Sequence, residues 1–318
     1  MKKDFARTNI LVSIQCLTYN HKKYIRQCLD GFVMQKTTFC FEAIVHDDAS
    51  TDGTAEIVRE YAEKYPDIIK PIYEEENQYS KHIPGLITNI VNKRCQGKYI
   101  AICEGDDYWI DPLKLQKQVD ALESDDSLGV VYTKAKKVDN KTGKVIEILG
   151  EKYKTFDDLI IKNRIPTLTV CYRKELYDLY TNTVVKNLQG VSLGDYPMWL
   201  FFALRSKIVF IDKICAVYRV LEESASHSTS SDKMIRYHTT VYKICLFYVN
   251  NFPNSLKNKE KVLFSIEDRF EWCKYRVLQA EAFPKRIILS NDTLKKMSLR
   301  HKLIYSINKY ALKLGYLL

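Results

Sequence analysis

Apolar and polar positions alternate in blocks over the first 130 residues. Short apolar runs of strand length begin near residues 9, 41, 68 and 98, and each run is followed by a stretch with helical periodicity. The second run, for example, precedes a stretch that ends at Pro66. Strands and helices that alternate four times with short connections predict a largely parallel sheet covered by helices.

The pattern changes beyond residue 128. Short strands are predicted at 129–132, 208–211 and 215–218, with a hairpin turn at 139–143, a polar turn at 165–171 that leads into a further strand, and an apolar helix at 198–204. A polar, serine-rich stretch at 222–232 follows, and two long helical stretches come after it, at 234–249 and 259–282. We therefore expect a catalytic domain over residues 1–222 and a helical C-terminal extension over residues 223–318.

Polar residues follow three of the predicted strands, at 18–20, 47–48 and 104–107. The carboxyl ends of parallel strands lie along one edge of a sheet, where ligands bind in open α/β folds. We expect these three segments to converge there.

Glu104, Asp106 and Asp107 place three carboxylates within four residues. Like charges this close repel one another, and a divalent cation that carries substrate phosphates is the simplest compensating group. The alternative is a solvated acidic turn before a helix, with Asp111 as N-cap and Pro112 at the first helical position. The residues alone leave both interpretations open.

The net charge of +10 is unevenly distributed. Residues 1–120 contain 16 basic and 18 acidic side chains, whereas residues 231–318 contain 17 and 7. An acidic site-bearing half argues against nucleic acid as a partner. The basic excess includes an amphipathic stretch at 294–318, which either lies on an anionic membrane surface or docks on its own protein with its charges in water.

The nine cysteines include no C-x-x-C pair, which is typical of reduced thiols in a core. The first residues lack the apolar segment of a signal peptide, and no apolar run reaches about 18 residues. We expect a cytoplasmic protein without a membrane-spanning helix.

Four motifs, taken in order, resemble the inverting family-two glycosyltransferases of the GT-A fold, of the bacterial polysaccharide and cell-surface glycan type. They lie at 12–20, 45–54, 97–107 and 194–195. The resemblance covers about residues 9–220. It implies a Rossmann-like, mixed but mostly parallel sheet flanked by helices.

The resemblance also implies roles for particular residues. Asp195 would be the general base, a role compatible with its other interpretation as the N-cap of a helix. Asp106 and Asp107 would hold Mn²⁺ or Mg²⁺, although the sequence does not say which is the main ligand. The nucleotide sugar would be bound by Thr18, Tyr19, Asn20, Asp47, Asp48, Glu104 and Asp106.

The chain departs in three places from the pattern of the family that it resembles. Glu104 stands where an aspartate is more usual, Lys81 or His82 would have to serve the phosphates, and no histidine follows Tyr218-Arg219 at the usual spacing.

The expected function is metal-dependent transfer of a sugar from a nucleoside-diphosphate sugar, with UDP as the expected nucleotide. The acceptor would be a saccharide or lipid-linked saccharide, in cell-envelope polysaccharide synthesis at the inner face of the cytoplasmic membrane. One alternative is a nucleotidyltransferase acting on a sugar phosphate, although residues 17–21 lack the glycine-rich cradle that such an enzyme uses. The other is a catalytically inactive relative that binds nucleotide sugars.

Overall fold

A computed structural model describes residues 9–81, 83, 85–188, 194–221, 230–282 and 288–311, with the backbone alone at 281–282 and 307–311. Contacts divide the chain into two compact units. The first comprises residues 1–153 and 164–220, and the second comprises residues 154–163 and 221–318. Each unit is described by itself.

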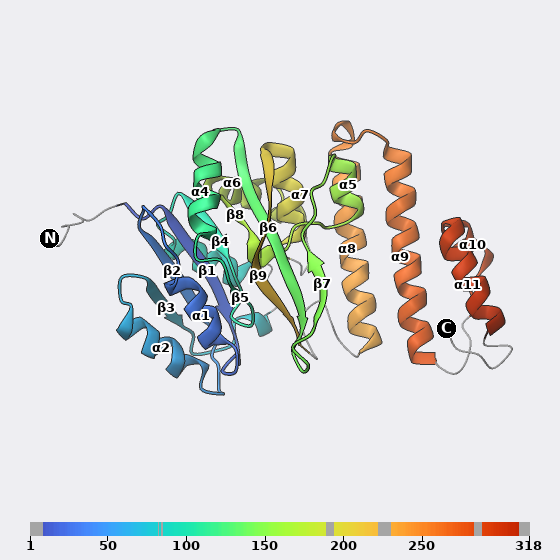
Figure 1. Cartoon of the computed structure of the whole chain (residues 1–318). Coiled ribbons are helices and arrows are strands. Elements are labelled where there is room, and N and C mark those ends of the chain that lie inside the picture. The colour runs from blue at the N-terminus through green and yellow to red at the C-terminus, as the bar shows by residue number, and fades with distance from the viewer. Residues whose placement is uncertain are drawn as a thin grey trace. The chain divides into compact units, whose positions relative to one another are not determined.

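The first unit alternates strands and helices in its first half and is richer in strands in its second (Figure 1). Its strands are β1 (Val12–Thr18), β2 (Phe41–Asp47), β3 (Ile69–Tyr73), β4 (Tyr99–Ile102), β5 (Tyr108–Trp109), β6 (Leu128–Asp139), β7 (Val145–Leu149), β8 (Cys171–Arg173) and β9 (Lys207–Val220). Its helices are α1 (Ile25–Val33), α2 (Thr54–Lys64), η1 (Tyr79–Lys81), α3 (Leu86–Arg94), α4 (Lys114–Ser124), η2 (Thr167–Thr169), α6 (Lys174–Thr183), η3 (Val185–Asn187) and α7 (Tyr196–Arg205).

The strands form one sheet in the order β3-β2-β1-β4-β8-β6-β9-β5, with β7 paired to β6. Strand β1 runs parallel to β2 and β4, β2 runs parallel to β3, and β6 runs parallel to β9. The β4–β8, β6–β8, β5–β9 and β6–β7 pairs are antiparallel. The mixed, helix-flanked sheet that the sequence predicted is confirmed.

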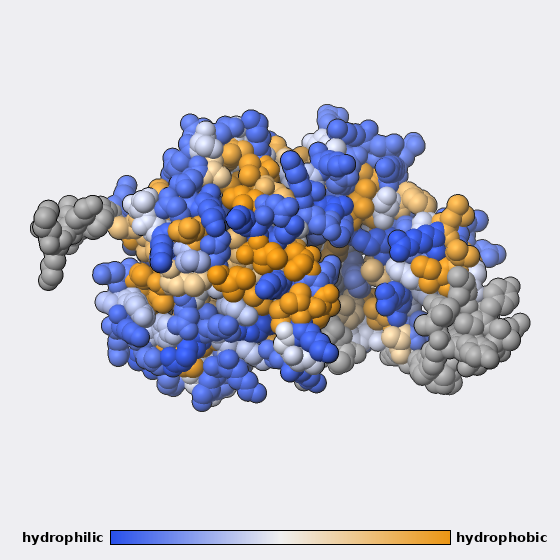
Figure 2. Space-filling model, in the orientation of Figure 1, coloured by the Kyte–Doolittle hydropathy of each residue, from blue (hydrophilic) through white to orange (hydrophobic). Residues whose placement is uncertain are grey.

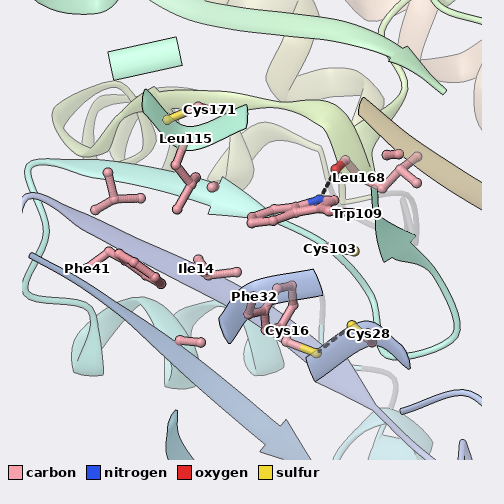
Figure 3. Close-up of a cluster of buried hydrophobic side chains, with 14 of the residues drawn as sticks. Ile14, Cys16, Cys28, Phe32, Phe41, Cys103, Trp109, Leu115, Leu168 and Cys171 are labelled. Carbon is pink, nitrogen blue, oxygen red and sulfur yellow. Dashed lines mark hydrogen bonds between the residues drawn. The ribbon is translucent and has the colours of Figure 1, made fainter. Parts of the chain in front are cut away.

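Side chains of β1 alternate between the two faces of the sheet, as the period of a strand requires. Val12, Ile14 and Cys16 are fully buried in a core with α1, α2 and α4, part of which Figure 3 shows. On the other face, Gln15 donates a hydrogen bond to Asn92 of α3. The sheet is therefore covered on both faces at β1, and the second face buries the polar side chains of Ser13 and Gln15.

The edge strand β7 is the most exposed strand of the sheet. Val145, Ile146 and Ile148 are all exposed on it. Figure 2 shows apolar surface over the middle of this unit, where β6 and β7 lie.

Lys114, at the start of α4, is fully buried in the apolar core. Its Nζ donates a hydrogen bond to Gln118 Oε1 at 2.7 Å and lies 3.9 Å from the centre of the Trp109 ring. Burial lowers the pKa of this amine to about 8. The folded state therefore disfavours the charged form of Lys114.

We expect Lys114→Met to remove a pH dependence of stability. The folded pKa lies below the ordinary value of 10.5, so the unfolded chain binds more protons between pH 8 and 10.5. As the pH rises over that range, this group should increase the free energy of unfolding of the wild type by about 3 kcal/mol in total. Chemical denaturation at several pH values would measure the difference between wild type and variant. Lys36→Met, which changes an exposed lysine, is the control, and an equal pH dependence in Lys114→Met and wild type would contradict the expectation.

The second unit is helical (Figure 1). Its elements are α5 (Phe156–Ile161), α8 (Ser231–Asn251), η4 (Pro253–Ser255), α9 (Lys259–Ala282), α10 (Asn291–Lys295) and α11 (Leu299–Ala311). Tyr242 of α8 stacks on Phe270 of α9, with ring centres 4.5 Å apart. Asp157 of α5 accepts hydrogen bonds from two backbone N–H groups just before α9, which ties α5 to the C-terminal helices. Within the described residues, no helix is long and apolar enough to cross a membrane.

Several expectations about local structure were wrong. By residue type Ser50 and Asp52 are both plausible N-caps for the helix before Pro66, but α2 begins after Gly53, whose φ of 98° suits glycine, and neither residue caps it. Instead, Asp52 accepts hydrogen bonds from the backbone and side chain of Thr54. Helix α4 begins at Lys114 rather than at Pro112, because Asp111 caps a turn by accepting from the Leu113 N–H.

The long strand β9 replaces the two strands predicted at 208–211 and 215–218. The strand is continuous because its pairing with β6 shifts register, and these shifts accommodate the polar residues between the two apolar runs. The amphipathic stretch at 294–318 suggests one continuous helix, but its described residues do not form one. Helix α10 ends at Lys295 and α11 begins at Leu299, while residues 312–318 lie outside the described part of the chain.

Candidate active site

Three loops meet at the carboxyl edge of the parallel strands. The backbone N–H of Asp48 donates to the Thr18 carbonyl at 3.0 Å, and the N–H of Gly105 donates to the Leu17 carbonyl at 2.8 Å. These bonds join the loops that follow β1, β2 and β4, as the sequence predicted.

Asn20 ties the first two loops together. It adopts a left-handed backbone conformation with a φ of 54°, which asparagine tolerates. Its N–H donates to Ser50 Oγ, and its side-chain oxygen accepts from the Thr51 N–H, both at 2.9 Å. The Asn20 side chain therefore sets the position of the loop after β2.

The two aspartates at the end of β2 have different surroundings. The carboxylate of Asp48 accepts from the N–H groups of Gln78 and Tyr79, at 2.7 and 3.0 Å, and so holds the loop before η1. Asp47 is 2% exposed, and its Oδ2 accepts from the Ser50 N–H. Asp47 Oδ1 is buried and has no hydrogen-bond partner among the described residues.

Gly105 allows the acidic loop to approach the first loop closely. A Cβ atom at this position would lie 2.7 Å from Thr18 Oγ1 and 3.0 Å from His21 Nδ1. Both of these atoms are buried, and within the described chain neither has a hydrogen-bond partner. Burial lowers the pKa of His21, although the nearby charge of Asp106 opposes this shift. Tyr19, by contrast, leaves its ring 45% exposed at the same edge.

The acidic loop concentrates negative charge in a partly buried place. Burial raises the pKa of Glu104 to about 7, and the charges of Asp106 and Asp195 add to this effect. Burial also raises the pKa of Asp107 well above its ordinary value, with further contributions from Asp106 and Glu104. Protein groups therefore balance the negative charge of these carboxylates only in part.

Arg219 is a site residue that the sequence reasoning missed. It lies at the end of β9, where its N–H donates to Asp107 Oδ1 at 2.8 Å. Its guanidinium donates to the Asp106 carbonyl and to Gln27, and it lies over the ring of Tyr108 at 4.3 Å. Arg219 thus fixes the acidic loop through backbone and side-chain contacts. The sequence placed this residue only at a strand end, with no indication of these partners.

A divalent cation fits the charge of this loop. The guanidinium of Arg219 contacts the carbonyl of Asp106, which leaves the Asp106 carboxylate available to a ligand. Asp107 is buried and already holds the Arg219 N–H, so Asp106 is the better placed of the two. No group of three or more His, Cys, Asp or Glu side chains in the described ranges is arranged as a metal site. Mg²⁺-type sites use one or two carboxylates together with substrate phosphates, so such a group is not required.

Asp195 begins α7 and is its N-cap, as one of its two interpretations predicted. Its Oδ1 accepts from the Tyr196 N–H at 2.7 Å, and its Oδ2 accepts from Thr167 Oγ1 at 2.6 Å. Its charge adds to the raised pKa of Glu104. Thr167 belongs to η2, whose Leu168 carbonyl accepts from the indole N–H of Trp109 in β5, the strand that follows the acidic loop. Hydrogen bonds therefore connect Asp195 to the segment after the acidic loop.

The proposed phosphate-binding residues are less well defined. Lys81 is partly exposed and donates to Gln78 Oε1 at 2.9 Å, while His82 lies outside the described residues. The contacts of Lys81 therefore do not assign a phosphate to its side chain.

The model of Glycosyl transferase family 2 matches residues 13–178. The chain belongs to this glycosyltransferase family. A relative from Mycobacterium tuberculosis, an uncharacterized protein, is 34% identical over 228 residues, which cover 70% of this chain and 62% of that protein. Chondroitin synthase from Escherichia coli is 27% identical over 207 residues, which cover 64% of this chain and 28% of the synthase. The chain thus spans less than two thirds of the length of these relatives.

Solved structures confirm the GT-A glycosyltransferase fold. Staphylococcus aureus TarS 1–349 in complex with UDP-GlcNAc has a TM-score of 0.56 at 20% identity, over 96% of this chain and 93% of that one. A mannosyltransferase from Pyrobaculum calidifontis in complex with GDP-Man and Mn²⁺ has a TM-score of 0.58 at 17% identity, over 96% and 85% of the two chains.

Proposed function

We propose that the chain is a metal-dependent, inverting glycosyltransferase that uses a nucleoside-diphosphate sugar, with UDP as the expected nucleotide. The observation that carries this proposal is the junction of the three strand-end loops, with Asp195 connected to the segment after the acidic loop through Thr167, Leu168 and Trp109. The family supports sugar transfer, and the two solved structures are complexes with nucleotide sugars.

The donor nucleoside would bind at the loops after β1 and β2. The exposed ring of Tyr19 offers a stacking surface for a base. The unpartnered Oδ1 of Asp47 can accept a hydrogen bond from an N–H or hydroxyl of the nucleoside, and its burial makes an unmade bond costly. Asp48 would act indirectly, because its carboxylate holds the loop at 78–79. Thr18 and Asn20 shape the same edge.

Asp106 would hold Mn²⁺ or Mg²⁺, while Asp107 and Glu104 line the same loop. When bound, such an ion neutralises the charge that develops on the leaving diphosphate. Arg219 keeps the loop in place for this purpose through its contacts with Asp106 and Asp107.

Asp195 would be the general base. It would take the proton of the acceptor hydroxyl as that oxygen attacks the anomeric carbon from the face opposite the leaving group. This geometry inverts the anomeric configuration. The acceptor would be a saccharide or lipid-linked saccharide, a proposal supported by the relationship to chondroitin synthase.

The test of this proposal is a panel of UDP-sugars and GDP-mannose, measured by heat stabilisation with and without Mn²⁺. We expect one donor to raise the melting temperature in the presence of Mn²⁺, and Asp106→Ala to lose this effect. The matched control is Asp139→Ala, which changes a turn carboxylate that accepts from Thr142. A panel in which no donor and no metal shifts the melting temperature would contradict the proposal.

We also propose that the C-terminal helices bind an anionic membrane surface. Leu299 and Leu303 are 85% and 62% exposed on α11, beside the exposed cations Lys295, Lys296 and Arg300. Figure 2 shows apolar and hydrophilic side chains next to one another where α10 and α11 lie. Exposed apolar side chains flanked by cations fit an anionic interface, where each cation contributes about 1 kcal/mol.

Vesicles of phosphatidylglycerol should therefore bind the protein at low salt, and vesicles of phosphatidylcholine should not. Leu299→Ser/Leu303→Ser should weaken sedimentation with the anionic vesicles by about tenfold. The control is Val145→Ser/Ile146→Ser, which removes exposed apolar side chains from β7 instead. Equal binding by both variants and the wild type would exclude this use of α11.

A further inference from the structure

Both oxygens of the Asp195 carboxylate are held by donors of the protein. The Tyr196 N–H holds Oδ1 from within the helix terminus, and Thr167 Oγ1 holds Oδ2 across a separation of 28 residues. Asp195 remains only partly buried, so the carboxylate can still meet a substrate. Its orientation thus depends on a side chain from another segment.

That segment, η2, is itself fixed by buried polar contacts. The indole N–H of Trp109 donates to the Leu168 carbonyl at 2.8 Å, a bond drawn in Figure 3. Gln118 Nε2 donates to the Thr169 carbonyl at 2.7 Å. Leu168, Thr169 and Trp109 are all buried, so these bonds are shielded from water. The turn therefore presents the Thr167 hydroxyl from a rigid base.

The same turn is linked to the acidic loop. Trp109 belongs to β5, which directly follows the loop at 104–107 and pairs with the β9 strand that ends near Arg219. Two hydrogen bonds therefore link the segment after the acidic loop to Asp195, one from Trp109 to Leu168 and one from Thr167 to Asp195. These bonds set the distance between Asp195 and the acidic loop.

We propose that Thr167 is a positioning residue for Asp195, and this inference rests on the proposed function. Its hydroxyl donates to Oδ2 and keeps the carboxylate turned so that a free lone pair faces the acceptor hydroxyl. Without this bond only the Tyr196 N–H holds the carboxylate, at Oδ1, and the group can turn about its Cβ–Cγ bond. Loss of alignment by about 1 Å can cost about 100-fold in rate.

The test compares Thr167→Val, Thr167→Ser and Thr37→Val by the Mn²⁺-dependent release of nucleoside diphosphate from the UDP-sugar and GDP-mannose panel, with a mixture of saccharide acceptors present to take the sugar. Thr167→Val should lower kcat by about 10- to 100-fold with little change in the donor KM. Thr167→Ser keeps the hydroxyl and should recover most of kcat. Thr37→Val is the matched control. Its hydroxyl donates to the Phe39 carbonyl in the connection between α1 and β2, away from η2, so this variant should lose stability while keeping kcat.

A double-mutant cycle separates positioning from a general structural role. In an Asp195→Asn background, Thr167→Val should cause no further loss of kcat, because the two residues act as a unit. The same loss in both backgrounds would overturn the inference, as would a Thr167→Val variant with the kcat of the wild type. If Asp195→Asn is inactive and Thr167→Val is unaffected, the proposed function stands and only the role of Thr167 fails. If Asp195→Asn has the kcat of the wild type, both assignments fail.

A crystal structure of Thr167→Val gives a readout that does not depend on turnover. We expect the Asp195 carboxylate to rotate from its position in the wild type while α7 stays in place. An unchanged carboxylate would overturn the inference.

Discussion

Asp195→Asn should lower kcat for sugar transfer by about 10²- to 10⁴-fold, because an amide cannot take a proton from the acceptor hydroxyl. The fold should survive, since the amide oxygen can still accept the Tyr196 N–H at the start of α7. Donor binding should therefore stay close to that of the wild type. Steady-state kinetics together with heat stabilisation by the donor would measure both quantities.

Asp139→Asn is the control for this prediction, because it changes another carboxylate that accepts backbone N–H groups, in the β6–β7 turn. It should retain kcat. An Asp195→Asn enzyme that keeps more than about a tenth of the wild-type kcat would show that another group accepts the proton.

Asp106→Asn should weaken Mn²⁺-dependent donor binding by about 100-fold or more, since a bound metal supplies several kcal/mol of charge stabilisation. Calorimetric titration of UDP with and without Mn²⁺ would measure this loss. Binding without Mn²⁺ should change little, because the contacts at the loops after β1 and β2 remain.

Asp107→Asn is the matched comparison for the metal ligand. Asp107 is buried and its Oδ1 accepts the Arg219 N–H, a bond that an asparagine oxygen can keep. This variant should retain most of the metal dependence. If Asp107→Asn loses the metal and Asp106→Asn keeps it, the roles of the two carboxylates are reversed.

Local patterns predicted much of the fold and one edge of the site. Apolar runs followed by amphipathic stretches predicted the parallel strands, because the hydrophobic periodicity of a strand or a helix can be recognised within a short segment. The convergence of polar strand ends followed from that topology, and the Gly-Asp motif placed Asp195 at a helix start. These are features that neighbouring residues determine.

The contacts that complete the site were not predictable in the same way. Arg219 reaches Asp107 across 112 residues, and Thr167 reaches Asp195 across 28, so no local pattern reports either pair. Lys114 is a charged residue on an amphipathic helix, yet it lies in the core because Trp109 and Gln118 surround its amine. The roles of the site residues remain predictions that these experiments test.

The most direct measurement is the fate of the sugar itself. The protein would be incubated with Mn²⁺, each nucleotide sugar of the panel and a mixture of saccharide acceptors, and the products identified by mass spectrometry. The account predicts that one donor is consumed, that nucleoside diphosphate and a glycosylated acceptor form together, and that Asp195→Asn abolishes both products. Consumption of no donor, or equal product from wild type and Asp195→Asn, would contradict it.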